Sequence, residues 1–195
     1  MVWFIHIRVR SNPSTTANNL TGSILVATPT LKDPNFRRTI LFISYHSVKD
    51  GALGFVLNRP LEKTLGEVYY LGSADILATV PLYYGGPVAP HEINVARLNW
   101  IEQPRAAKFQ SFTKLIESGN ISPERVQGLR AFAGHSGWHG GQLEEEIAHK
   151  AWFVLPPSRN LIDMPNPTSA WKDTLRQMNP ILKLLVEIPD DPSLN

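Results

Sequence analysis

The sequence predicts a mixed α/β (α+β) fold, in which a mostly antiparallel sheet is flanked by a few helices. Runs rich in β-branched and aromatic residues come in clusters, and helical patterns separate the clusters instead of following each strand. The sixteen prolines in 195 residues indicate many short elements. Hydrophobic residues make up 43% of the chain and charged residues 18%, a balance that excludes wholesale disorder.

Strands are predicted where a short apolar run is closed by proline, glycine or a turn-forming pair. Lys49, Asp50 and Gly51 form such a turn signal, and we expect them to join two strands in an antiparallel hairpin. The predicted strands cover residues 22–28, 38–45, 52–58, 80–84, 92–98, 129–133 and 152–155.

Helices are predicted from capping residues and from the spacing of apolar residues. Thr64 and Glu67 form a capping box, which indicates that a short helix begins there. Apolar residues recur at helical spacing from Phe109 onward, so we expect an amphipathic helix that faces the core. The predicted helices cover residues 64–71, 106–118, 142–150 and 168–177, with a single helical turn at 122–126.

Residues 20–178 are predicted to form a single domain, because the chain provides about one domain's length. Residues 1–19 are expected to be an N-terminal extension and residues 179–195 a C-terminal tail. No apolar stretch approaches the roughly 18 residues of a membrane span, and the N-terminus lacks the charge order of a signal peptide. These features lead us to expect that the protein does not contact a membrane. Because the chain also has no cysteine, we expect it to be cytoplasmic.

Several classes of site are excluded or disfavoured by composition. The net charge of +2 is too small to indicate direct binding of nucleic acid, which attracts strongly basic surfaces. The lack of cysteine excludes thiolate zinc sites, iron–sulfur clusters and a thiol nucleophile. His135 and His139 have the four-residue spacing of zinc ligands on a helix, but Gly137 between them argues against a helix. We therefore expect neither a metal ion nor another cofactor.

The segment 134–141, with the sequence GHSGWHGG, lies between a predicted strand and a predicted helix. This is the context of a nucleophile elbow, in which a serine stands on a tight turn above a helix N-terminus. Trp138 replaces the last glycine of the G-x-S-x-G pattern, and no complete set of triad partners follows Ser136. The sequence thus names no catalytic residue, and a hydrolase that uses Ser136 or a glutamate of segment 134–146 stays an alternative.

A series of short motifs resembles the AlgH/YqgE family of bacterial proteins over about residues 20–178. The motifs are ATP at 27–29, DPNF at 33–36 followed by Arg38 and Thr39, GALG at 51–54, NRP at 58–60, GGP at 85–87, and GHSGW with GGQLEEEI within 134–147. Members usually have a tyrosine and a small residue where this chain has His135 and Ser136. The resemblance implies a bifurcated sheet curled into a pseudo-barrel, and it implies no defined reaction. The label of transcriptional regulator on some members comes without a recognisable DNA-binding motif.

Several of these motifs stand at predicted strand ends, where ligands often bind. An arginine at a strand exit can hold a carboxylate or phosphate through paired hydrogen bonds, or it can pair with Glu62 or Glu67 at the surface. If the strand ends converge, they form one cleft; otherwise the glycines are a structural hub beneath Trp138. The residues of this candidate cleft are Asn58, Arg59, Gly85, Gly86, Pro87, Trp138, Gln142 and Glu145.

The function that the sequence favours is a non-enzymatic regulatory module, because no complete catalytic set is found. Its partner would be a small molecule or another protein, bound in the candidate cleft. A thermal-shift response to a small molecule would distinguish this function from a purely structural role of the same residues.

Overall fold

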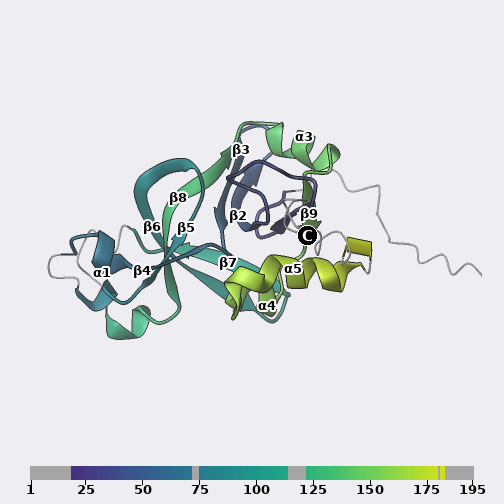
Figure 1. Cartoon of the computed structure of the whole chain (residues 1–195). Helices are drawn as coiled ribbons and strands as arrows, with labels where there is room; N and C mark the ends of the chain where they lie inside the picture. Colours follow the sequence, from purple (N-terminus) through teal and green to yellow (C-terminus); the bar gives the residue numbers. More distant parts are fainter. Residues whose placement is uncertain (1–18, 72–74, 114–121, 180, 183–195) are drawn as a thin grey trace, which may run out of the picture.

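The computed structural model describes residues 19–71, 75–113, 122–179 and 181–182 (Figure 1). All but the last residue of the predicted N-terminal extension at 1–19, and most of the predicted tail at 179–195, lie outside these ranges. Within them the fold is the predicted mixed α+β structure, with a curled, half-barrel sheet and a few helices. None of the helices in the described ranges is long and apolar enough to cross a membrane.

Nine strands of the described chain form one sheet in the order β4-β5-β8-β3-β2-β1-β9, with β6 paired to β8 and β7 paired to β6. The β5–β8 pair is parallel and the other pairs are antiparallel, which confirms a mostly antiparallel sheet. The strands are β1 (Ile24–Ala27), β2 (Ile40–Ser47), β3 (Gly51–Val56), β4 (Pro60–Thr64), β5 (Pro81–Tyr84), β6 (Val88–Ile101), β7 (Ala106–Ser111), β8 (Leu129–Trp138) and β9 (Trp152–Leu155).

The hairpin predicted around the turn at 49–51 is confirmed and joins β2 to β3. Leu41 pairs with Val56 near its open end, and Ser47 pairs with Gly51 next to the turn. The strands predicted at 22–28, 80–84 and 152–155 are also confirmed, as β1, β5 and β9. All four side chains of β1 are buried, so its uninterrupted apolar run reflects a strand covered on both faces.

The sheet divides at β8, as the family resemblance implies. Residues 131–133 of β8 pair with β5, whereas residues 136–138 pair with β3. Gly134 lies between these two stretches with φ +69, and a Cβ at this position would approach the carbonyl oxygen of Gly86 to 2.6 Å. A left-handed backbone and a close approach of two chains both require glycine, so the glycines at this point permit the division.

The predicted helix over 106–118 is wrong in its first half, where the structure has strand β7. This strand pairs with the last residues of β6, and residues 114–118 lie outside the described ranges. Phe109 stacks on Phe55 with ring centroids 4.8 Å apart, which places its side chain in the core. Pairing with β6 outweighs a helical spacing that a few apolar residues satisfy by chance. β6 also extends well beyond the predicted strand at 92–98.

The helices predicted after Thr64, at 142–150 and at 168–177 are confirmed, although the first ends at Val68 rather than near residue 71. The predicted capping box is also present, because Thr64 N–H donates to Glu67 Oε2 at 2.7 Å. Figure 1 shows α1 at one end of the sheet and the other labelled helices toward the opposite end. The helical segments are α1 (Leu65–Val68), η1 (Asp75–Leu77), η2 (Pro123–Arg125), α3 (Gln142–Ala148), α4 (Arg159–Asp163) and α5 (Pro167–Met178).

α5 packs on the sheet through one face. Trp171 and Leu175, four residues apart and therefore on the same side of the helix, are buried in the core cluster that includes β1 and β2 residues. Trp171 Nε1 also donates to the carbonyl oxygen of Ala27 in β1 at 2.7 Å. This docking brings the first turn of α5 to the end of the sheet at which β2 begins.

Candidate functional site

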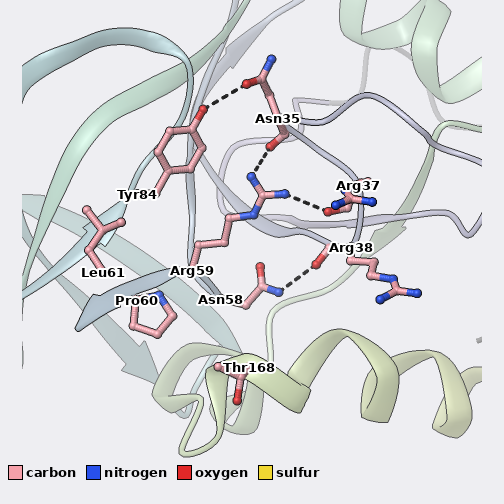
Figure 2. A pocket seen from close by; sticks show the side chains of 9 residues that line it. All are labelled: Asn35, Arg37, Arg38, Asn58, Arg59, Pro60, Leu61, Tyr84 and Thr168. Atoms are coloured by element: carbon pink, nitrogen blue, oxygen red, sulfur yellow. Dashed lines mark hydrogen bonds between the residues drawn. The ribbon is translucent and has the colours of Figure 1, made fainter. Parts of the chain in front are cut away.

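A pocket of about 680 Å³ opens where four segments of the chain meet (Figure 2). They are the turn before β2, the start of β4 just after β3, the end of β5 and the first turn of α5. The volume lies within the range of small-molecule sites. We call it the arginine pocket; it is lined by Asn35, Arg37, Arg38, Asn58, Arg59, Pro60, Leu61, Tyr84 and Thr168.

Arg59 fastens the turn that forms one wall of this pocket. Its Nη1 donates to the carbonyl oxygen of Asn35 at 2.8 Å, and its Nη2 donates to those of Arg37 at 2.9 Å and Pro34 at 3.3 Å. These partners are backbone carbonyls, rather than the surface glutamates that the sequence left open. Burial lowers the pKa of Arg59, Tyr84 raises it, and the charge of Arg37 lowers it. The Arg59 guanidinium thus holds the turn before β2 through hydrogen bonds, and its positive charge lies beside the cavity.

Asn58 lies at the back of the pocket and is only 7% exposed. Its Oδ1 accepts the N–H of Ile40 at 2.8 Å, and its Nδ2 donates to the carbonyl oxygen of Arg38 at 2.9 Å. Arg38 has φ +57, a left-handed conformation that costs free energy for a residue other than glycine. Asn58 therefore acts as a positioning residue, because its amide stabilises the left-handed backbone of Arg38, whose guanidinium lies over the ring of Trp171 with 5.6 Å to the ring centroid.

The charged side chains among the described lining residues of the pocket are arginines. Arg37, Arg38 and Arg59 belong to its lining, and no Asp or Glu does among the described residues. Asp33 lies nearby, but its carboxylate accepts backbone N–H groups of its own turn, the nearer at 2.8 Å. The first turn of α5 adds the positive end of a helix dipole. The electrostatic environment of the pocket therefore favours an anion.

Tyr84 belongs to the opposite, less polar side of the pocket. Its backbone N–H donates to the carbonyl oxygen of Arg59 at 2.9 Å, and its hydroxyl donates to Asn35 Oδ1 at 3.4 Å. Burial raises the pKa of Tyr84, and the charge of Arg59 offsets part of this rise. Pro60 and Leu61 lie on the same side, and Figure 2 shows them across the pocket from Arg37 and Arg38.

Among the other hollows in the part of the chain that the structure describes, three of comparable size have no lysine or arginine in their lining. One of about 360 Å³ lies between α1 and β6, one of about 420 Å³ lies between α4 and α5, and one of about 370 Å³ lies beside α1. The arginine pocket is larger than these three hollows, and its lining combines arginines with Pro60, Leu61 and Tyr84. It is therefore the strongest candidate for a ligand site.

Gly85, Gly86 and Pro87 follow Tyr84 but do not line the arginine pocket. They lie where the sheet divides, and the carbonyl oxygen of Gly85 accepts the Ser136 hydroxyl at 3.2 Å. Ser136 is 0% exposed and lies inside β8, so the turn interpretation of segment 134–138 is wrong. A buried hydroxyl that is hydrogen-bonded to a carbonyl is not presented to a substrate as an elbow serine is.

Trp138 and Gln142 meet at a carboxylate that sequence reasoning did not single out. Glu146 Oε2 accepts the indole N–H of Trp138 at 2.9 Å and that of Trp152 at 2.7 Å, and Glu146 Oε1 accepts Gln142 Nε2 at 3.0 Å. We call these four side chains the Glu146 cluster. Glu145, which was a candidate, is exposed and makes no side-chain hydrogen bond to the cluster. The candidate cleft is thus not one site: Asn58 and Arg59 lie in the arginine pocket, Trp138 and Gln142 lie in the Glu146 cluster, and the remaining candidates, Gly85, Gly86, Pro87 and Glu145, belong to neither.

The histidines of the described chain belong to structural contacts or to the surface. His46 Nδ1 accepts the N–H of Leu20 at 3.1 Å, so its Nε2 carries the proton that it donates to Glu144 Oε1 at 2.8 Å. His135 is half-buried in β8 and His139 is exposed. Within the described ranges no group of three His, Cys, Asp or Glu side chains is placed to hold a metal ion.

Sequence reasoning found Asn58 and Arg59 and missed the rest of the pocket lining. Asn35 and Arg38 belong to the motifs that carry the family resemblance, so a signal for them was present. Arg37 adjoins those motifs, whereas the place of Tyr84 and Thr168 depends on the pairing of β5 and the docking of α5. Those two residues could be found only from the fold.

Comparison with known proteins settles the family. A family model described as AlgH-like matches residues 24–183. The chain belongs to the AlgH-like family. Its relatives include a UPF0301 protein of Streptomyces avermitilis, 34% identical with 93% of this chain and 98% of that protein covered. A UPF0301 protein of Streptomyces coelicolor is 35% identical with the same coverage. The family resemblance drawn from the sequence is confirmed.

Two solved structures share the AlgH-like fold of this chain. A protein of Corynebacterium diphtheriae superimposes with a TM-score of 0.66 and 24% identity, covering 90% of this chain and 94% of its own. The AlgH protein of Pseudomonas aeruginosa superimposes with a TM-score of 0.60 and 24% identity, covering 91% and 98%. At this level of identity the likeness supports the fold, and the chemistry must be argued from the arginine pocket itself.

Proposed function

We propose that this AlgH-like protein is a non-enzymatic regulatory module that binds a small anion in the arginine pocket. One observation carries the proposal: a pocket of about 680 Å³ has three arginines and no acidic side chain in its described lining. Positive charges that lie near one another repel, so an anion bound close to these arginines lowers the free energy of the folded state. A ligand that binds the folded protein stabilises it. A regulator that responds to a ligand needs this coupling between ligand binding and the state of the protein.

The polar groups of the pocket support binding rather than catalysis. Arg59 and Asn58 donate hydrogen bonds to backbone carbonyls, so they shape the site rather than move protons. The described lining contains no histidine or carboxylate that could act as a general base. Arginine remains protonated at neutral pH and holds carboxylate or phosphate oxygens in bidentate geometry.

A thermal-shift titration with inorganic phosphate tests the proposal. At a hundred times its dissociation constant, phosphate should add about 2.7 kcal/mol to the free energy of unfolding. For a chain of this length the melting temperature should then rise by about 5–11 °C. We expect the Arg37→Ala/Arg38→Ala double variant to lose the shift. Arg105→Ala should retain it, because Arg105 is an exposed residue of the β6–β7 turn outside the pocket.

Two outcomes would show that the proposal is wrong. The first is a wild-type protein whose melting temperature does not respond to phosphate or sulfate in a buffer free of other multivalent anions. The second is an Arg105→Ala variant that loses the response as fully as the double variant does, because the effect would then reflect overall charge.

A further inference from the structure

We infer that His46 is a pH-sensitive latch, which holds the chain at Leu20 when the imidazole is neutral and releases it when the imidazole is protonated. Leu20 is the first residue of the domain predicted at 20–178, so the latch lies where the predicted N-terminal extension joins that domain. The inference goes beyond the proposed function, because the latch lies apart from the arginine pocket and needs no ligand.

The protonation state of His46 follows from the partner of each ring nitrogen. Nδ1 accepts the backbone N–H of Leu20 at 3.1 Å, and a backbone amide can only donate, so Nδ1 carries no proton. Nε2 donates its own proton to Glu144 Oε1 at 2.8 Å. His46 is 3% exposed, so water does not readily replace either partner. This arrangement therefore requires the neutral imidazole.

Protonation of the ring affects its two partners in opposite directions. An imidazolium ion has an N–H group at both nitrogens, so Nδ1 would face the Leu20 N–H as a second donor. The contact with the Glu144 carboxylate becomes an ion pair and is strengthened. A rotation of the ring that separated the two donors would break this ion pair. The chain at Leu20 is therefore the part that moves, because it is the partner that protonation repels.

The charges around the imidazole favour this exchange of partners. Within the described chain, Glu144 of α3 is the charged residue that contacts the ring. Residues 19–21 and strand β3 contain no charged residue. Asp50, in the turn after β2, accepts a hydroxyl of β2 at 2.9 Å, and Glu146 of α3 accepts two indole N–H groups. The two nearby carboxylates are thus engaged elsewhere, and Glu144 is left to stabilise the protonated ring.

The release is confined to Leu20, because the next residues are held by bonds that do not involve the ring. Thr21 Oγ1 accepts the backbone N–H of His46 at 2.9 Å. The N–H of Gly22 donates to the carbonyl oxygen of Ile43 at 2.7 Å. Neither bond depends on the charge of the imidazole. The side chain of Leu20 packs against one of the buried apolar clusters, so its release uncovers apolar surface there.

Nuclear magnetic resonance of the full chain between about pH 8 and pH 5 tests the inference, because histidine changes charge in this range. As His46 Nδ1 gains its proton, the Leu20 amide should shift. Its exchange with water should become at least about fivefold faster, after correction for the pH dependence of exchange itself, as expected for the loss of one hydrogen bond. The Gly22 amide should keep its shift and its corrected exchange rate, because its partner is Ile43.

Glu144→Gln should move the release of Leu20 to lower pH. The glutamine oxygen can still accept the Nε2 proton, but it lacks the charge that stabilises the imidazolium. The side chain of Glu144 is 37% exposed, so the variant should fold. Glu145→Gln is the matched control, because it removes the same charge from the exposed neighbouring position of α3. It should leave the pH of release near that of the wild type.

Four results would overturn the inference. The first is a Leu20 amide that does not respond while Nδ1 becomes protonated, and the second is an Nδ1 that stays unprotonated down to about pH 5. The third is a Gly22 amide that responds as strongly as Leu20, because acid would then loosen the whole segment. The fourth is a Glu145→Gln variant that moves the release as far as Glu144→Gln does, because the effect would then reflect overall charge.

Discussion

The arginine pocket and the Glu146 cluster are two dense groups of polar side chains joined by one turn of the chain. Phe36 stacks on Trp138 of the cluster at 6.1 Å between ring centroids, while its neighbours Asn35 and Arg37 line the pocket. In the cluster, the Glu146 carboxylate accepts three hydrogen bonds from side chains of the same protein. In the pocket, three arginines belong to a described lining that includes no carboxylate.

This difference separates a structural polar group from one that is available to a ligand. A charge inside a protein is stabilised when the fold itself supplies its partners, as it does for Glu146. Arg59 is hydrogen-bonded to carbonyl oxygens, which satisfy its donors without cancelling its charge. The Glu146 carboxylate thus has its hydrogen-bond partners within the protein, whereas the arginine pocket is the place where we propose that an anion binds.

Glu146→Ala is expected to have the largest effect of the changes considered, lowering the free energy of unfolding by about 3 kcal/mol. Two indole N–H groups and the Gln142 amide would lose their acceptor, and a buried donor without a partner costs about 1–3 kcal/mol. The melting temperature, measured by differential scanning calorimetry, should fall by about 6–12 °C.

The neighbouring residue supplies the control for this change. Glu145 is exposed, so Glu145→Ala should alter the free energy of unfolding by less than about 0.5 kcal/mol. Equal melting temperatures for the two variants would contradict a structural role for the cluster. Glu146→Gln should fall between them, because one amide oxygen can replace only part of what two carboxylate oxygens accept.

Asn58→Ala is expected to cost about 2 kcal/mol in urea-induced unfolding. The change removes the acceptor of the Ile40 N–H and the donor to the Arg38 carbonyl oxygen, both in a nearly buried position. The phosphate response should weaken as well, because the backbone of Arg38 loses its support. Asn160→Ala, at an exposed position on α4, should leave both measurements near the wild-type values.

Tyr84 should make the pocket sensitive to alkaline pH. Burial raises its pKa in the folded state, so the native protein holds this proton more firmly than the unfolded chain does. The protonated Tyr84 hydroxyl therefore contributes to the free energy of unfolding below the ordinary tyrosine pKa. This contribution is lost as pH rises through the folded-state pKa. Tyrosinate absorbance should show a late component that Tyr84→Phe removes and that Tyr70→Phe retains, Tyr70 being 93% exposed. A late component that survives in Tyr84→Phe would contradict this assignment.

The capping box of α1 should give the smallest effect. Hydrogen bonds from the Thr64 backbone and hydroxyl lower the pKa of Glu67. These bonds therefore contribute to the free energy of unfolding above the ordinary glutamate pKa, and the contribution is lost as pH falls through the folded-state pKa. Glu67→Gln should reduce stability slightly at neutral pH, and this difference should vanish in acid. Urea titrations at both pH values measure it. If Glu67→Gln lowered the free energy of unfolding as much as Glu146→Ala does, the exposure of a hydrogen-bonded carboxylate would not decide how much it stabilises the fold.

The sequence was sufficient for those parts of the fold whose signal is local. The hairpin at 49–51, the buried run of β1 and the capping box at Thr64 each follow from a few adjacent residues, and all are confirmed. The helix expected over 106–118 failed because the strand there is stabilised by β6, a partner that adjacent residues do not reveal. Local patterns therefore predicted those elements and turns whose stability comes from adjacent residues, and failed at 106–111, where a partner strand decides the structure.

The residues of the candidate site show the same contrast between local signals and long-range contacts. Asn58 and Arg59 were found because a polar pair at a strand exit is a local signal, and the glycines were found because turns need them. Tyr84 and Thr168 reach the pocket only through β5 pairing and α5 docking, so no window of the sequence contains them with Arg59. Glu146 was one of three consecutive glutamates, and only the positions of the two indoles distinguish it.

The position of β1 has a consequence for the synthesis of the protein. This first strand pairs with β2 on one side and with β9 on the other, and Trp171 of α5 donates to Ala27 from 144 positions downstream. A ribosome releases β1 long before these late partners, at about 5–20 residues per second. Until β9 emerges, the nascent chain therefore carries an apolar strand with one unpaired edge, a form that invites pairing with other chains. Synthesis of the C-terminal quarter supplies β9, which pairs with β1 and removes this free edge.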